Sequence, residues 1–374
     1  MNNMNPPIFR AIGMISGTSI DGIDTALIET DGADIVRPLA FLPHGYDAAF
    51  RERLRACFGK LEGNKDPAIA AFERELTELH AAQVEILLHN HNIKPEHIDI
   101  IGFHGQTIWH KPEERSTIQL GDGALLANLT GIPVVNDFRS ADVKAGGHGA
   151  PLVPLYHRAL AASLPKPVAI INIGGVSNIT WIGGARDDEI IAFDMGPGNA
   201  LIDDWVLHHN GQPYDEYGAL AASGCVDEGL VARFMAHPFF AEKPPKSLDR
   251  DAFRDLAPDE LSPADGAATL TMMTARAIAE GLRLVPQPPL HVYLTGGGRH
   301  NRTMMRWIGE LSGLPVGSVD ELGWSGDGLE AEAFAYLAVR SRLGLPLTLP
   351  GTTGVLQAMT GGRYYPASAS CTGR

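Results

Sequence analysis

The stretch that decides the fold is Ala11–Glu29, AIGMISGTSIDGIDTALIE. Two apolar runs, Ala11–Ile15 and Ile23–Ile28, flank the polar segment Ser16–Gly22, a pattern that predicts two strands joined by a glycine turn. Successive N–H groups in such a turn attract anions such as phosphate oxygens, and glycines allow the backbone angles that the turn needs. Taken alone, however, the stretch favours an ordinary hairpin, because glycine turns are common.

Length and composition narrow the class of protein. A chain of 374 residues suffices for two domains of roughly 100 to 200 residues each. The net charge of −14 argues against a nucleic-acid partner, and it leaves any bound phosphate to backbone amides, a cation or a few basic groups. The three cysteines lack metal or disulfide spacing. With neither an export signal nor a membrane span in sight, we expect a cytoplasmic protein.

Polar residues follow several predicted strands of the first half. The helices expected here are 47–58 and 67–90, with a loop at 38–45. The strand Ile98–Phe103 is expected to end at His104-Gly105-Gln106-Thr107, and two later strands run into Gly121-Asp122-Gly123 and Asn136-Asp137-Phe138-Arg139. A single His104 would more often be structural, but three such strand ends in succession favour a shared cleft.

The second half repeats the opening pattern. After the glycine-rich segment Ala145–Pro151, a candidate boundary between lobes, the strand Pro167–Asn172 leads into the turn Ile173–Asn178 and a second strand, Ile179–Ile182. Two strand-turn-strand units suggest a duplicated fold with a phosphate turn in each lobe. An accidental pair of hairpins is the alternative.

Asp194 is the main catalytic candidate. The strand Ile190–Phe193 delivers it to the N-terminus of a helix starting at Ala200, which Asn199 can cap. A carboxylate there would suit a general base or a cation contact, and the alternative is an Asp that stabilises a turn. Farther on, residues 214–265 are rich in loops, and Pro244–Ser247 is expected at the surface or lining a substrate site. Helices are expected at 267–284, 302–311 and 331–340, and a strand at 290–294 runs into a glycine turn at 295–298.

Seven motifs together resemble the bacterial 1,6-anhydro-N-acetylmuramic acid kinases. They run in the family's order from Gly13 to about Tyr365: GMISGTSIDGID, GFHGQTIWHKP, QLGDGALLANLTGIPVVNDFRSADVKAGGHGAPLVP, NIGGVSN, FDMGPGNALIDDW, TGGGRHN and GLEAEAFAYLA. The resemblance implies an α/β fold of two related actin-like (ribonuclease H-like) lobes around a nucleotide cleft. We expect residues 1–140 with about 345–374 in one lobe, and 141–344, with an inserted helical and loop segment, in the other.

The resemblance also implies an activity in peptidoglycan recycling. With ATP and Mg²⁺, such a kinase opens the anhydro ring with water and phosphorylates O6, giving N-acetylmuramic acid 6-phosphate and ADP. Asp194 matches the catalytic carboxylate. The matches to nucleotide-binding residues are Gly17, Thr18, Ser19, Ile20, Asp21, Gly22, Ile23, Asp24, Gly174, Gly175, Ser177, Asn178, Gly296, Gly297 and Gly298. Those to residues near the sugar are His104, Gln106, Asp137, Arg139 and Glu330.

Other expectations from the resemblance concern metal and assembly. A homodimer is expected. No metal ligand is assigned, because Met14-Ile15-Ser16 stands where the wider superfamily commonly has an Asp that organises magnesium. One alternative to this activity is a kinase that acts on a different sugar. A nucleotide-driven switch without catalysis is a second, and a metallohydrolase is a third, although His104 with His110 and His208 with His209 lack a zinc signature.

Overall fold

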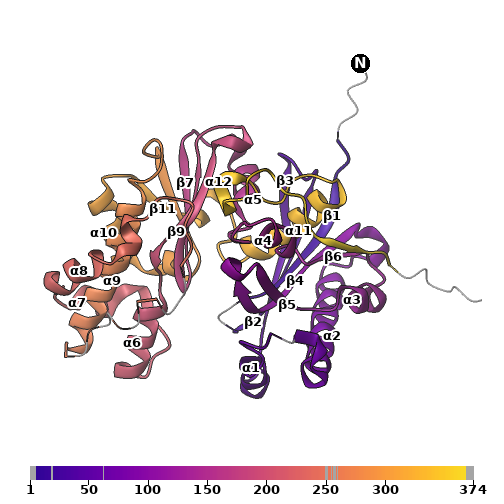
Figure 1. The fold of residues 1–374 in the computed structure, drawn as a ribbon, viewed down its shortest axis with the longest axis horizontal. Coiled ribbons are helices and arrows are strands. Elements are labelled where there is room, and N and C mark those ends of the chain that lie inside the picture. Colours follow the sequence, from indigo (N-terminus) through magenta and orange to yellow (C-terminus); the bar gives the residue numbers. More distant parts are fainter. Residues whose placement is uncertain are drawn as a thin grey trace, which may run out of the picture. The chain divides into compact units, whose positions relative to one another are not determined.

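The chain folds into two compact units (Figure 1). The structure is a computed structural model that describes residues 6–17, 20–61, 63–248, 252–253, 255, 258 and 260–367. Unit 1 comprises Met1–Ala162 and Gly328–Arg374, and unit 2 comprises Ser163–Asp327. These divisions differ from the predicted lobe boundaries at 140/141 and 344/345, and the glycine-rich segment Ala145–Pro151 lies inside unit 1.

Unit 1 is built on one mixed sheet. Its strands are ordered β12-β6-β4-β1-β2-β3, with β5 paired to β4. Strands β1, β2 and β3 pair antiparallel, whereas β1, β4 and β6 run parallel. The bounds are β1 Phe9–Ser16, β2 Gly22–Thr30, β3 Val36–Gly45, β4 Ile100–Lys111, β5 Ser116–Leu120, β6 Val134–Asn136 and β12 Arg363–Tyr365.

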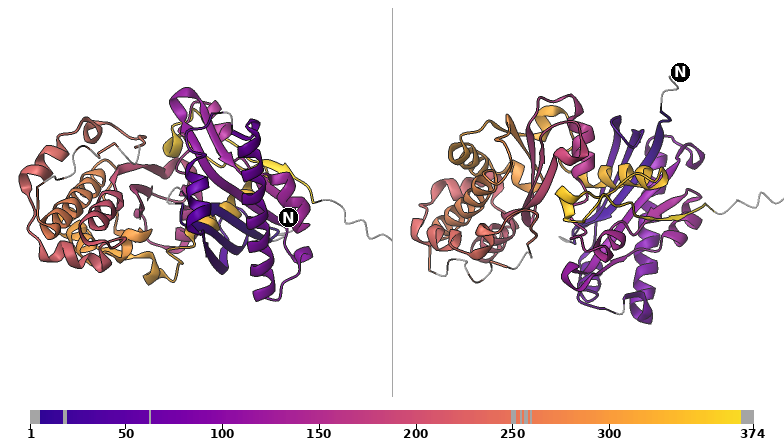
Figure 2. Two further views of the ribbon diagram at one scale, coloured as in Figure 1. Left: turned by 90° about the horizontal axis from the view of Figure 1, so that it is seen from below. Right: turned by 45° about the horizontal axis from the view of Figure 1, so that its top comes forward.

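Helices cover the sheet of unit 1. A buried core joins β1, β2 and β4 to α1, α2 and α3. Helix α11 (Leu329–Arg342) crosses the indigo strands in yellow (Figure 2, right). It approaches the strands so closely that a Cβ on Gly13 would lie 1.8 Å from the Ala331 carbonyl oxygen, which explains why this helix belongs to unit 1. The remaining bounds are α1 Ala48–Arg55, α2 Pro67–Asn90, α3 Gly123–Thr130, α4 Ser140–Lys144, α5 Pro154–Leu160 and α12 Pro350–Thr353.

Unit 2 repeats the topology of unit 1. Its sheet is ordered β11-β10-β7-β8-β9. Again the first three strands in sequence pair antiparallel, and the first runs parallel to the two later ones. The bounds are β7 Val168–Ile173, β8 Val176–Ile182, β9 Ile190–Pro197, β10 His291–Thr295 and β11 Val316–Ser318. The predicted α/β class and the repeated strand-turn-strand pattern are therefore confirmed.

The helices of unit 2 gather on one side of its sheet (Figure 1). Long α9 lies at the centre of a core that joins these helices to β7, β8, β9 and β10. The bounds are α6 Ala200–Asn210, α7 Ala219–Ser223, α8 Glu228–Met235, α9 Pro263–Gly281 and α10 Arg302–Ser312. Among the described residues of both units, no helix is long and apolar enough to cross a membrane.

In unit 1, two predicted elements were wrong. Residues 38–45 belong to strand β3, not to a loop, and the strand tolerates Pro38 and Pro43 because it lies at the edge of the sheet. Strand β4 does not end at Phe103 but continues to Lys111, because its second half pairs with β5. His104 and Gln106 thus lie within a strand.

Candidate active site

Asp194 lies within β9, the edge strand of unit 2, and a neighbouring loop holds it there. The prediction that this strand ends at Phe193 was wrong, because its pairing with β8 continues to Pro197. The backbone N–H of Asp194 donates to the Lys246 carbonyl at 3.0 Å, and the Leu248 N–H donates to Asp194 Oδ2 at 2.8 Å. Burial raises the pKa of Asp194 to about 7, although the Leu248 N–H and the charge of Lys246 act in the opposite direction. A carboxyl group with a pKa near neutrality is well suited to accept a proton.

The loop that holds Asp194 contains the segment predicted as exposed or substrate-lining. Lys246 is instead only 6% exposed, and its backbone faces β9. Neither Lys246 nor Leu248 was a candidate from sequence. No local pattern reveals their contact with Asp194, because 52 residues separate Asp194 from Lys246 along the chain.

The second predicted phosphate turn lies against Asp194 and the helix after it. Asn178 is directly opposite Asp194 in the β8–β9 ladder, so the two side chains lie on the same face of the sheet. The Asn199 N–H donates to the Gly174 carbonyl at 2.7 Å, and the Gly198 N–H donates to the Gly175 carbonyl at 2.9 Å. The turn is thus fixed to the N-terminus of α6.

Two side chains in this region make hydrogen bonds within the protein. Ser177 is fully buried and its hydroxyl donates to the Gly196 carbonyl, so it is engaged within the sheet. Asn199 stands at the N-cap of α6 but makes no capping hydrogen bond, so the predicted cap was wrong. Its side-chain amide donates instead to the Ile173 carbonyl at 2.9 Å, because the turn lies within reach.

The glycine turn after β10 packs against the end of β7, where the second predicted phosphate turn begins. Gly296 has φ +72° and ψ −177°, and a Cβ there would lie 2.3 Å from Asn172 Oδ1. A Cβ on Gly298 would lie 2.4 Å from Ile173 Cγ2. Unit 2 therefore brings together both of its predicted glycine turns.

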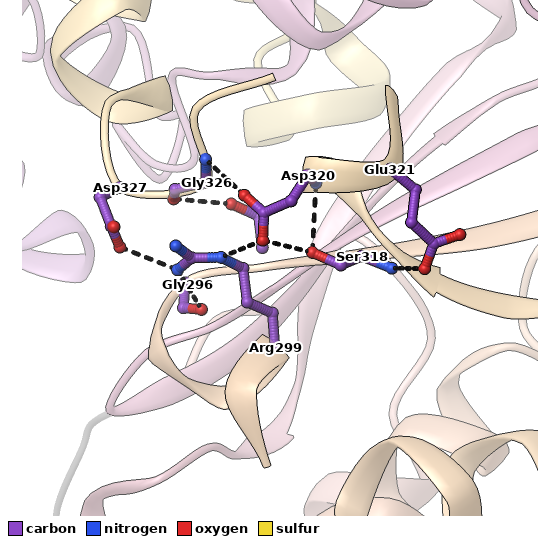
Figure 3. A network of polar contacts seen from close by, with 8 residues as sticks. Gly296, Arg299, Ser318, Asp320, Glu321, Gly326 and Asp327 are labelled. Carbon is purple, nitrogen blue, oxygen red and sulfur yellow. Dashed lines mark hydrogen bonds and ion pairs between the residues drawn. The ribbon is translucent and has the colours of Figure 1, made fainter. Parts of the chain in front are cut away.

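Arg299 ties this glycine turn to the last loop of unit 2 (Figure 3). Its Nη1 donates to the Gly296 carbonyl at 3.0 Å and to Asp327 Oδ1 at 2.8 Å. Its Nε donates to Asp320 Oδ2 at 3.0 Å, and the Ser318 hydroxyl donates to the same oxygen. The side chain of Arg299 is almost fully buried, so its hydrogen bonds hold the glycine turn in place.

A pocket of about 340 Å³ opens beside Gly297 in unit 2. Its lining combines two tyrosines with carboxylate, amide and imidazole groups. The lining residues are Asn199, Ile202, Asp203, Tyr214, Asp215, Glu216, Tyr217, Gly297, His300 and Asn301. Sequence reasoning missed Tyr214 and Tyr217, whose only signal was a loop-rich region without a readable motif.

In unit 1, the first predicted phosphate turn begins at a buried hydroxyl network. The Tyr46 hydroxyl donates to Ser16 Oγ at 3.0 Å, and Ser16 in turn donates to Gln106 Oε1 at 2.6 Å. Gln106 is fully buried and its amide nitrogen donates to the Thr107 carbonyl. Gln106, predicted to lie near the sugar, thus belongs to the buried network at the start of the turn.

The turn itself is described only in part. Thr18 and Ser19 lie outside the described residues. Ile20 has φ +60° and donates its N–H to the Gly17 carbonyl, while Asp21 pairs with Arg51 at 3.5 Å. A Cβ on Gly22 would lie 1.9 Å from the His44 carbonyl oxygen. Ile23 and Asp24 already belong to strand β2.

The other predicted sugar residues cluster in unit 1. Arg139 Nε donates to His104 Nε2 at 2.9 Å, and its Nη1 donates to the Gly149 carbonyl at 2.7 Å. Burial and the Arg139 cation hold the pKa of His104 well below its usual range, so the ring is neutral and its Nδ1–H donates to the Gly105 carbonyl. Burial lowers the pKa of Arg139 to about 10, against the opposing charges of Glu330 and Asp142. Arg139 therefore remains a cation at neutral pH.

A second pocket, of about 360 Å³, includes His104 and Asp137 in its wall. Asp137 has φ +55°, a strained conformation that non-glycine residues adopt mainly at turns and functional sites. The lining is polar and carries several carboxylates with one cation. It comprises Glu73, His104, Thr117, Ile118, Gln119, Gly121, Asp122, Gly123, Asn136, Asp137, Ser140, Arg363 and Tyr365.

Known proteins match almost the whole length of this chain. The family model described as anhydro-N-acetylmuramic acid kinase matches residues 9–367. Curated proteins of that name from Rhizorhabdus wittichii and Paramagnetospirillum magneticum are each 51% identical, over 94% and 95% of this chain and 97% and 99% of their own lengths. Among solved structures, a ROK hexokinase from Thermus thermophilus aligns with a TM-score of 0.41 and 16% identity, over 88% of this chain and 100% of that one.

Proposed function

Since this chain belongs to the anhydro-N-acetylmuramic acid kinase family, we propose that it hydrolytically opens 1,6-anhydro-N-acetylmuramic acid and phosphorylates O6. ATP is the phosphoryl donor, and the products are N-acetylmuramic acid 6-phosphate and ADP. The observation that carries the proposal is the placement of Asp194, opposite Asn178 of strand β8, which follows the glycine turn, and with a pKa near neutrality. Such a kinase acts in peptidoglycan recycling.

The chemistry assigned to Asp194 is general base catalysis. Its carboxylate takes a proton from a water molecule, whose oxygen bonds to the anomeric carbon as the bond from that carbon to O6 breaks. O6 then attacks the γ-phosphorus, and the bond to the β-phosphate oxygen breaks to release ADP. Phosphoryl transfer is accelerated mainly by positioning and electrostatics, so the turns act by holding phosphates with backbone N–H groups.

Each unit contributes one pocket to the proposal. The pocket at Gly297 suits a nucleoside, since bare glycine backbone lets a flat ligand approach and Tyr214 and Tyr217 offer aromatic surface. The pocket at His104 and Asp137 suits a sugar, because its donors and acceptors match hydroxyl groups. The turn Gly174–Asn178 would hold phosphates.

Magnesium would enter with ATP. Among the described residues, no group of three or more His, Cys, Asp or Glu side chains is placed to hold a metal ion. The residues present therefore do not form a dedicated cage, and phosphate oxygens with water would supply most ligands of Mg²⁺. No step is assigned to a protein-bound metal.

A cytoplasmic location and a homodimer complete the proposal. The family resemblance supports the homodimer, and the three cysteines without disulfide spacing support the location. Sedimentation of the purified chain at several concentrations measures the oligomeric state, and a monomer at every concentration would contradict the dimer.

The test of the proposed function is mass spectrometry of the product formed in oxygen-18 water. Purified protein is incubated with ATP, magnesium and 1,6-anhydro-N-acetylmuramic acid. We expect one added phosphoryl group and one heavy oxygen at the anomeric carbon. If the sugar is recovered unchanged while ATP is bound or hydrolysed, the proposal fails, and a different acceptor or a nucleotide switch is favoured.

Changing Arg139 to glutamine tests the sugar pocket through His104, the lining residue to which Arg139 donates. We expect the KM for the sugar to rise by about 10- to 100-fold, since a charge-assisted hydrogen bond contributes about 1.5–3 kcal/mol. The Kd for ATP, measured calorimetrically, should stay unchanged. Arg37→Gln, which removes an exposed arginine of unit 1 paired with Glu29, is the matched control. An increase in the ATP Kd with no effect on sugar KM would remove Arg139 from this site.

Changing Arg299 to methionine tests the glycine turn. The loss of hydrogen bonds to Gly296, Asp320 and Asp327 should loosen the turn and leave carboxylates without their cation. We expect the Kd for ATP to rise by about tenfold or more, which corresponds to about 1.4 kcal/mol. Arg306→Met, on the exposed side of α10, serves as control. An unchanged ATP Kd in a folded Arg299 variant would show that the turn does not depend on it.

A further inference from the structure

Lys246 is a buried lysine that the proposed chemistry leaves without a role. Lysine is almost never fully buried unless its charge is paired. Here the ammonium Nζ donates to the Phe239 carbonyl at 2.8 Å and lies 4.0 Å from the centroid of the Phe239 ring. Phe239 itself is 4% exposed, within the short helix Pro238–Ala241. The side chain is therefore anchored in the interior at considerable desolvation cost.

The same lysine contacts the carboxylate residue through its backbone. The Lys246 carbonyl accepts the Asp194 N–H at 3.0 Å, and two residues later the Leu248 N–H reaches Asp194 Oδ2 at 2.8 Å. Anchoring the Lys246 side chain on Phe239 thus fixes the segment that orients the Asp194 carboxyl group. One loop sets both the position of Asp194 and one hydrogen bond to its carboxylate.

We infer that Lys246 is the positioning residue for Asp194: its anchored side chain fixes the loop that orients the carboxylate, and its positive charge favours the ionised, proton-accepting form. This inference rests on the proposed function only for the role of Asp194 as a base. The contacts and the charge stand independently of the substrate.

The charges around the pair support this assignment. Burial raises the pKa of Asp194, whereas the Lys246 cation lowers it and so keeps a base available near neutral pH. Burial lowers the pKa of Lys246, and the carboxylates of Glu242 and Asp194 oppose that effect. These three groups are the charges that act on the pair among the described residues. Removing the cation should therefore make Asp194 harder to ionise.

The test is the pKa of the Asp194 carboxyl group, followed by carbon-13 NMR in wild type and in Lys246→Met. Asp194→Asn identifies the signal. We expect the pKa to move up by about half a unit or more, because a neighbouring opposite charge lowers a carboxyl pKa. In the pH profile of kcat/KM, the acid limb should move in the same direction by the same amount. Lys246→Arg, which keeps the charge, should leave both values near those of wild type.

Lys166→Met is the matched control. Its ammonium also donates to a backbone carbonyl, that of Leu164 at 2.7 Å, and burial also lowers its pKa, yet it is not among the charges that act on Asp194. An Asp194 pKa that is the same in Lys246→Met and wild type would overturn the inference. Should the methionine variant not fold, Lys246→Gln, which can still donate to Phe239, takes its place.

The two proposals fail in different ways. A wild-type protein that leaves the sugar unchanged would overturn the kinase proposal, while the NMR titration would still report whether Lys246 governs the Asp194 pKa. Conversely, if the enzyme is active and the acid limb of its kcat/KM profile is the same in Lys246→Met as in wild type, only the inference about Lys246 is overturned.

Discussion

Asp194→Asn is expected to lower kcat by about 10²- to 10⁴-fold, the contribution typical of a positioned general base. Asparagine keeps the shape of the side chain and can still accept the Leu248 N–H through its amide oxygen. The geometry of the site therefore survives while the proton acceptor is lost. Calorimetric affinities for ATP and for the sugar should stay within several-fold of wild type.

The pH profile adds a second readout for this variant. Because the base must be ionised and the pKa of Asp194 is about 7, wild-type kcat/KM should fall as the pH drops below about 7. Residual activity of Asp194→Asn should lack this limb. Asp204→Asn, an exposed acid on helix α6, should behave as wild type in both measurements. Wild-type turnover in Asp194→Asn would show that another group is the base.

The same substitution should raise stability at neutral pH. The folded pKa of Asp194, about 7, is above the unfolded value of 3.8, so its stabilising contribution is complete below pH 3.8 and is lost as the pH rises to 7. Asparagine carries no charge, so the folded state does not lose stability at this position as the pH rises. We expect the free energy of unfolding at pH 8 to be higher in Asp194→Asn by about 1–3 kcal/mol, and the difference to shrink toward pH 4. Denaturant titrations at both pH values measure it.

The architecture was largely predictable because both lobes repeat a pattern that is local in sequence. Each first pair of strands is joined by a short polar glycine turn, and the apolar runs on either side of the turn predict paired strands. Strand β3 escaped prediction since its prolines disfavour a central strand, and only the sheet order shows that it lies at an edge. The sequence also did not show that α11 belongs to unit 1, because this depends on long-range packing against Gly13.

The candidate site was predictable where residue type carries the chemistry, as with Asp194 and the glycine turns. It was not predictable where a role depends on burial. Gln106 resembles a ligand contact in sequence, yet its amide is used inside the protein by Ser16 and Thr107. The segment around Lys246 has the composition of a surface loop, and only the fold brings its backbone into contact with Asp194. Such roles arise from contacts between segments far apart in sequence.

Gly296→Ala is expected to weaken ATP binding while leaving the proposed base intact. With φ +72° and ψ −177°, Gly296 occupies a backbone region that is essentially restricted to glycine, where another residue costs about 1–3 kcal/mol. The new Cβ would also lie 2.3 Å from Asn172 Oδ1 and 2.8 Å from the Ile173 carbonyl oxygen. The two turns of unit 2 must then move apart. We expect the Kd for ATP to rise by tenfold or more, which corresponds to about 1.4 kcal/mol, with a lower unfolding temperature.

Two alanine variants separate the causes of that effect. Gly313→Ala introduces a side chain at φ +67° with no atom within 4 Å, so it should lower stability by about 1 kcal/mol through backbone strain without changing the ATP Kd. In Gly297→Ala the new Cβ lies 3.4 Å from Asn199 Nδ2 in the pocket wall, so ATP affinity should fall with little loss of stability. If Gly296→Ala lost stability but kept wild-type affinity for ATP, as Gly313→Ala should, the glycine turn would be a structural element and the nucleoside would lie elsewhere.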